Sequence, residues 1–165
     1  LGVDAKEIAA CADSVMFCLS KGLAAPVGSM VAGTKEFIEK ARKNRKLMGG
    51  GMRQAGVLAA AGIIALEKMT KRLHVDHENA AYLADQLSRI PGVNVKANRL
   101  DINMVFFEMG PDVIPEQKLI DYFLKNGIKI SGPEDGEWRF VSNVNVTRED
   151  IDFVVEKFRE CLGIE

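Results

Sequence analysis

The stretch that decides the fold reads Ser14-Val15-Met16-Phe17-Cys18-Leu19 and passes directly into Ser20-Lys21-Gly22. Its apolar run has the length and composition of a buried strand, so we expect Lys21 to stand where a strand ends and a loop begins. Partial burial lowers the pKa of a lysine and exposes its free amine, which can then condense with an aldehyde. Taken alone, the pattern fits an ordinary surface lysine better.

The composition is typical of a soluble globular protein. Of the 165 residues, 47% are apolar and 27% are charged, which is ample for a core. Lysine and arginine number 22 against 23 acidic residues, a net charge of −1. This balance removes the electrostatic basis for binding nucleic acid or an anionic membrane, and we expect neither partner.

The metal-binding residue types are few and poorly spaced. Cys11, Cys18 and Cys161 are odd in number and form no C-x-x-C pair, which predicts a reduced, cytoplasmic protein without a zinc site. His74 and His77 stand three residues apart, but no further histidine accompanies them. We interpret both as solvated surface residues and expect no metal site.

Residues 1–70 combine glycine-rich loops with apolar segments. We expect a second buried strand over 27–32, a helix over 35–47 capped by Thr34, and a helix over 53–69. The last helix is apolar on every face, which is typical of a helix buried all round. A chain of this length offers few partners for such a helix. We therefore expect that a part of the protein outside this sequence, or an oligomer interface, covers the helix.

Residues 71–165 alternate short strands with amphipathic helices, and the composition shifts near residue 70. The expected order is a helix over 71–89, strands over 93–95 and 103–108, a helix over 115–126, strands over 128–130 and 138–142, and a final helix. Thr147 and Asp150 form a near capping box at the start of the final helix. The sequence pattern of the whole chain therefore predicts an α/β protein.

Two further features could bind anions. The run over 49–56, Gly-Gly-Gly-Met-Arg-Gln-Ala-Gly, places clustered backbone amides and Arg53 before a helix, which suits a phosphate. A glycine-rich turn between helices is an equally good interpretation. Arg139 lies within a short strand, and we expect its side chain to face away from Trp138 and Phe140, where it is half-exposed or grips a carboxylate.

Residues 13–23, 26–29 and 49–56 closely resemble the low-specificity L-threonine aldolases. These are pyridoxal 5′-phosphate (PLP) enzymes of the aspartate aminotransferase fold type, fold type I. The similarity continues through 59–63, 76–80 and 103–105 to Arg139 and the final helix. It covers essentially the whole chain, but only the C-terminal half of such an enzyme.

The resemblance implies a fold and a set of site residues. Residues 1–70 would end the large α/β PLP-binding domain, and residues 71–165 would form the small C-terminal α+β domain. Lys21 would form the Schiff base with PLP, Lys46 and Arg53 would lie near its phosphate across a subunit interface, and Arg139 would bind the substrate carboxylate. Relatives often carry a histidine where this chain reads Val141-Ser142-Asn143, which departs from the family pattern.

The implied activity is retro-aldol cleavage of L-threonine or L-allo-threonine to glycine and an aldehyde such as acetaldehyde, by a cytoplasmic homodimer or homotetramer. This would be a step of threonine catabolism and glycine biosynthesis. The family's phosphate loop, ring-stacking residue, pyridine aspartate and catalytic base belong to an N-terminal half whose motifs do not occur here. We therefore expect this chain alone to be inactive. The alternatives are another fold type I PLP lyase that carries out β-elimination, and a non-catalytic oligomerisation fragment.

Overall fold

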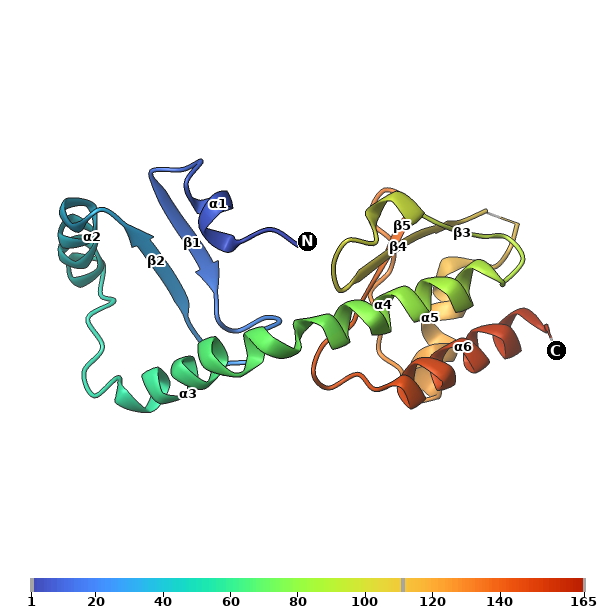
Figure 1. Ribbon diagram of the computed structural model, residues 1–165. Helices are drawn as coiled ribbons and strands as arrows, with labels where there is room; N and C mark the ends of the chain where they lie inside the picture. Colours follow the sequence, from blue (N-terminus) through green and yellow to red (C-terminus); the bar gives the residue numbers. More distant parts are fainter. Residues whose placement is uncertain (1, 111, 165) are drawn as a thin grey trace. The chain divides into compact units, whose positions relative to one another are not determined.

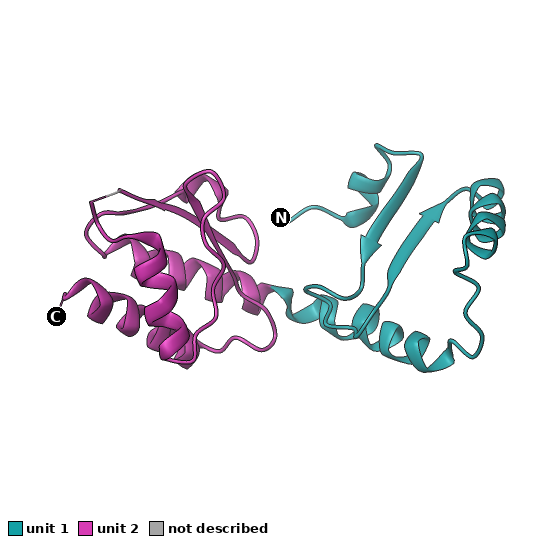
Figure 2. Ribbon diagram, turned by 180° about the vertical axis from the view of Figure 1, so that it is seen from behind, with its two compact units in different colours: residues 1–73 teal, residues 74–165 magenta. Residues whose placement is uncertain are grey.

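A computed structural model describes residues 2–110 and 112–164, and it divides the chain into two compact units (Figure 2). The first unit comprises residues 1–73 and the second residues 74–165. Their assignment to the end of a large domain and to a small domain stays a prediction.

The first unit contains a β-hairpin ladder and two longer helices (Figure 1). In chain order its elements are α1 Ala5–Ala9, β1 Ser14–Cys18, β2 Ser29–Gly33, α2 Lys35–Leu47, α3 Gly56–Glu67 and the 3₁₀ turn η1 Met69–Arg72. Strands β1 and β2 pair antiparallel, with Ser14 opposite Gly33 and Cys18 opposite Ser29. The predicted N-cap of α2 is confirmed, because the Phe37 amide donates to Thr34 Oγ1 at 3.3 Å.

The predicted burial of the two strands is wrong within this chain, and the apolar α3 is also exposed within it, where the sequence predicts few covering partners. Met16 on β1 is 62% exposed, every residue of β2 is exposed, and Val57 on α3 is 81% exposed. Among the described residues, neither strand of the ladder has a buried residue, and α3 buries only Gly62 and Ala65. Apolar sequence alone does not bury an element, since burial needs covering surfaces on each side.

The second unit packs helices against one face of a three-stranded antiparallel sheet (Figure 1). The sheet order is β3-β4-β5, and the elements are α4 Leu73–Ser88, β3 Val93–Val95, the 3₁₀ turn η2 Ala97–Arg99, β4 Met104–Met109, α5 Glu116–Lys125, β5 Glu137–Val141 and α6 Arg148–Leu162. The core lies between the sheet and the helices. Phe107 and Trp138 of the sheet meet Leu87, Phe123 and Phe158 of the helices in one buried cluster.

Local signals set the boundaries of these elements. The capping box at α6 is confirmed, because Thr147 Oγ1 accepts from the Asp150 amide at 3.2 Å and Asp150 Oδ2 accepts from the Thr147 amide at 2.8 Å. Gly127 follows α5 with φ +77°, a left-handed conformation that ends the helix.

The predicted strand over 128–130 is wrong. These residues have no regular secondary structure, although Ile128 donates its amide to Phe123 O at 2.8 Å. The local sequence favours an extended conformation, but among the described residues no strand pairs with this segment. A strand exists only where a partner satisfies its backbone groups.

Candidate functional site

Lys21 stands at the end of a strand, in a loop closed by backbone hydrogen bonds. The Leu19 amide donates to Gly28 O at 2.9 Å, the Ala25 amide to Leu19 O at 2.9 Å, and the Ala24 amide to Lys21 O at 2.8 Å. The predicted change from strand to loop at this lysine is thus present. The Lys21 side chain is exposed, so its primary amine is accessible.

The loop that carries Lys21 rests on the C-terminal half of α3. Leu19, Ala25 and Ala65 form the small buried cluster of this unit. A side chain added at Gly62 would come within 3.2 Å of Leu19 Cδ1, and one added at Gly22 within 3.3 Å of Leu73 Cδ2. These close approaches fix the loop beside the later turns of α3 and the residues that follow it.

Lys46 lies over the glycine-rich loop that connects α2 to α3. A Cβ atom added at Gly51 would come within 2.6 Å of Lys46 Cδ and 3.1 Å of Lys46 Nζ, so a larger residue would displace this lysine. Gly50 donates its amide to Arg45 O at 2.8 Å, and Gly49 has φ +84°. The exposed Lys46 side chain therefore lies close beside Gly51 of this loop.

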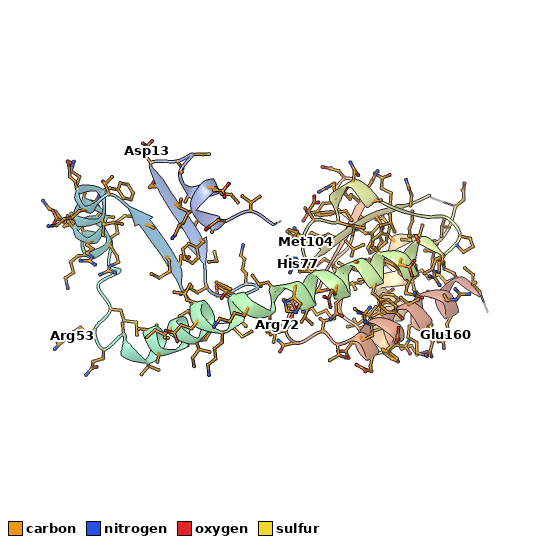
Figure 3. All side chains as sticks on the ribbon, viewed as in Figure 1. Asp13, Arg53, Arg72, His77, Met104 and Glu160 are labelled. Carbon is orange, nitrogen blue, oxygen red and sulfur yellow. The ribbon has the colours of Figure 1, made fainter. Side chains whose placement is uncertain are left out.

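Arg53 extends from the same loop, just before α3 (Figure 3). Helix α3 begins after Ala55 without a capping side chain, so its first amides are open to an external acceptor. Its 12 residues span about 18 Å. Because Lys21 lies beside the later turns of α3 and Arg53 precedes its first turn, one chain holds these two residues at opposite ends of the helix.

Arg139 belongs to the second unit, on β5. It is exposed opposite Phe106 of β4, whereas Trp138 is 2% exposed and Phe140 is half-buried. The predicted alternation of this strand is confirmed. Arg139 lines a cavity of about 540 Å³ together with Phe106, Glu137, Lys129 and Glu134.

The charged residues nearest to Arg139 along the sheet are paired with one another. Arg99 Nη1 lies 2.8 Å from both carboxylate oxygens of Glu137. The Arg99 guanidinium also stacks 3.7 Å from the centre of the Phe106 ring. Glu108, opposite Glu137 in the ladder, pairs with Lys96 at 2.7 Å. Among the described residues, Arg139 itself has no ion pair.

The end of β5 is fastened to the start of β4. The Ser142 amide donates to Asn103 O at 2.9 Å, and Asn103 Nδ2 donates to Ser142 O at 2.6 Å. The Asn143 side chain accepts from the Asn145 amide at 3.0 Å and so shapes the turn that follows. Ser142 Oγ is buried and lacks a hydrogen-bond partner within the described residues.

The histidines do not assemble into a metal site. His74 is exposed and His77 half-buried on α4. Within residues 2–110 and 112–164, no group of three histidine, cysteine or acidic residues could hold a metal ion. In the same described ranges, no helix has both the length and the apolar character needed to cross a bilayer.

Sequence reasoning missed Arg99 and Glu137. The alternation of β5 places Glu137 on the same face as Arg139 and could have identified it. Arg99 carries no local signal, because it meets Glu137 from a 3₁₀ turn 38 residues earlier in the chain.

Comparisons with known proteins identify a family of lyases and several threonine aldolases as relatives of this chain. The family described as beta-eliminating lyase matches residues 1–109. Low-specificity L-threonine aldolase 1 of Arabidopsis thaliana is 38% identical over 163 residues, and the low specificity L-threonine aldolase of Escherichia coli K12 is 41% identical over 162 residues. Each match covers 98% of this chain and 46% of the relative, so the chain spans about half the length of these proteins.

Solved structures share the fold. A Listeria monocytogenes protein described as a candidate L-allo-threonine aldolase matches with a TM-score of 0.76 at 19% identity, over 96% of this chain and 47% of that one. A PLP-dependent aminotransferase of Streptococcus suis matches with a TM-score of 0.69 at 18% identity, over 91% of this chain and 41% of that one. The chain therefore has the α/β fold of the C-terminal part of fold type I enzymes, as predicted.

Proposed function

Because this chain belongs to the beta-eliminating lyase family, we propose that the protein containing it is a PLP-dependent L-threonine aldolase. The observation that carries the proposal is its similarity, over 98% of its length, to low-specificity L-threonine aldolases at 38% and 41% identity. The proposed reaction cleaves L-threonine or L-allo-threonine to glycine and acetaldehyde. When bound, PLP supplies an electron sink for such a cleavage.

The residues of the first unit fit PLP. Lys21 offers an exposed primary amine to an aldehyde carbon, and its loop is fixed by backbone hydrogen bonds. Lys46 and Arg53 offer cations to a phosphate beside the open amides at the start of α3. We therefore assign Lys21 to covalent attachment and the other two residues to phosphate binding.

The phosphate-binding pair would serve the site of a second subunit. One chain holds Lys21 and Arg53 at opposite ends of α3, about 18 Å of helix apart. That separation supports a homodimer or homotetramer in which Lys46 and Arg53 of one chain complete the site of another. A cytoplasmic location is part of the same proposal.

Arg139 would bind the substrate carboxylate. It is exposed, it lines a cavity, and none of the described residues forms an ion pair with it. A guanidinium binds a carboxylate with two parallel hydrogen bonds, which restricts the rotation of the bound amino acid. That restriction would help to select which bond of the substrate breaks.

The assay of the full-length protein with PLP tests the function. We expect glycine and acetaldehyde from L-threonine and from L-allo-threonine. The family description favours β-elimination as the second candidate, for which ammonia and a keto acid would be the products. Ammonia and keto acid without glycine would replace the first proposal by the second.

Lysine substitutions test the assignment of Lys21. In the full-length protein, Lys21→Ala should abolish the visible absorbance band of lysine-bound PLP, which lies at longer wavelength than that of free PLP, whereas Lys43→Ala, an exposed lysine on α2, should leave it unchanged. The 165-residue chain alone should bind little PLP. Equal absorbance in wild type and Lys21→Ala would refute the assignment.

A further inference from the structure

We propose that Arg99 is a positioning residue that keeps Glu137 away from Arg139, so that the Arg139 guanidinium stays available to a carboxylate ligand. The proposal deepens the proposed function, on which it rests, because it explains how the carboxylate site avoids neutralisation by its own neighbour. It concerns residues on one face of the β3-β4-β5 sheet, all within the second unit.

Glu137 is the built-in competitor for Arg139. The two residues are separated by one position on β5, so their side chains leave the same face of the sheet roughly 7 Å apart. Long side chains can bridge such a distance. Both residues line the same cavity of about 540 Å³, and the Glu137 side chain is 27% exposed. Without another partner, Glu137 would pair with Arg139.

Arg99 supplies that other partner with a defined geometry. Its Nη1 contacts both carboxylate oxygens of Glu137 at 2.8 Å. Its guanidinium is held in place by the Phe106 ring at 3.7 Å, and Phe106 stands directly opposite Arg139 in the ladder. A stacked and paired arginine loses little further freedom, so it outcompetes Arg139 for Glu137.

The remaining charges on this face do not replace Arg99. Glu108 stands opposite Glu137 and repels it. Lys96, which directly follows β3, is already paired with Glu108 at 2.7 Å. Lys129 and Arg139 are the two other cations that line this cavity. Arg139 lies two positions from Glu137 on the same strand and face, so loss of Arg99 leaves Arg139 as the partner that the strand geometry favours.

Kinetics of the full-length, PLP-loaded protein test this inference. Arg99→Gln should raise the KM for L-threonine about three- to fivefold, the effect of one competing ion pair, while kcat changes less than about twofold. Arg99→Gln combined with Glu137→Gln should return KM to within about twofold of wild type. Arg89→Gln, which removes the exposed pair with Asp85 on α4, is the matched control and should leave both constants unchanged.

The single variant Glu137→Gln distinguishes the Arg99–Glu137 ion pair from a long-range effect of these two charges on ligand binding. If Arg99 sequesters Glu137, this single change should alter KM by less than about twofold. A three- to fivefold fall in KM, the reverse of the Arg99→Gln effect, would show that both residues act only through their charge and would overturn the inference. Failure of the double variant to recover would overturn it as well.

Glycine binding by calorimetry keeps this test independent of the reaction. If wild type binds glycine but forms no aldolase products, the proposed function fails. A dissociation constant for glycine that rises in Arg99→Gln and recovers in the double variant would still support the role of Arg99. Glycine binding that is equal in wild type and Arg99→Gln overturns the inference. Absence of glycine binding by wild type also overturns it, because Arg139 then serves no carboxylate.

Discussion

The two units differ in how much of their apolar sequence they bury. In the second unit, helices α4, α5 and α6 cover one face of the sheet, and Phe107, Trp138 and Phe158 are almost fully buried. In the first unit, the described residues of the buried cluster are only Leu19, Ala25 and Ala65. The second unit thus has a core of its own, whereas the apolar side chains of the first unit are largely exposed. We infer that the second unit carries most of the stability of this chain.

The largest expected effect is the difference in hydrogen exchange between the two units of the 165-residue chain. Amides of α6 should exchange more slowly than those of α3 by a factor of about 1,000 or more, because α6 opens only when the core of its unit unfolds. Exchange followed by mass spectrometry on fragments of the two helices measures this ratio. Equal protection would show that α3 is covered in solution and would contradict the difference in burial between the two units.

A phenylalanine substitution in each unit gives the next largest difference. Phe158 is fully buried, with ring centres 5.7 Å from Phe123 and 6.3 Å from Phe107. Phe158→Ala should lower the free energy of unfolding of the second unit by about 3–5 kcal/mol. Phe37→Ala on the exposed α2 should change it by less than about 0.5 kcal/mol.

Urea unfolding followed by fluorescence measures both variants, because the single tryptophan, Trp138, lies buried in the second unit. A loss below about 1 kcal/mol for Phe158→Ala would contradict the packing of that core.

The elements were predictable where the signal is local. Thr34 and Thr147 mark helix starts by side chains that reach amides only three residues away, and both caps are present. Burial was not predictable, because it depends on what covers an element. The apolar run of β1 therefore gave correct secondary structure and wrong exposure, whereas the exposed α3 is the helix for which the sequence predicts too few partners within this chain. The strand over 128–130 failed for the same reason, since pairing needs a distant partner.

The candidate site shows the same limit. Lys21 could be placed at a strand end from its neighbours alone, and the exposed face of Arg139 followed from alternation. The resemblance, not the residue pattern, supplied their proposed roles. The pairing of Arg99 with Glu137 was out of reach because 38 residues separate them and only the fold brings them together.

Helix caps give a smaller difference between the units. Thr147→Ala removes the acceptor for the Asp150 amide at the start of α6, whose buried residues belong to the core. We expect a loss of about 1 kcal/mol in the unfolding monitored at Trp138. Thr34→Ala removes an equivalent cap from α2, which buries no residue, and should leave that transition unchanged. Equal losses in the two variants would mean that α2 belongs to the same cooperative unit as α6.

The smallest expected effect is a pH-dependent change in the stability of the second unit. Glu160 on α6 accepts from Lys157 Nζ at 2.7 Å and from Tyr122 Oη of α5 at 2.8 Å, and these two hydrogen bonds lower the pKa of its carboxyl. A carboxyl with a lowered pKa stabilises the folded state above its ordinary pKa of about 4.3, and this stabilisation is lost as the pH falls through the lower, folded pKa.

Glu160→Gln should therefore lower the urea midpoint slightly at pH 7, and the difference from wild type should shrink as the solution is acidified below about pH 4. Glu36→Gln is the matched control, since its partner Lys40 at 2.7 Å lies on the exposed α2. It should leave the midpoint unchanged at every pH, because an exposed ion pair contributes little and α2 buries nothing. A Glu160→Gln deficit that persists undiminished in acid would mean that Tyr122 and Lys157 bind the side chain through its shape rather than its charge.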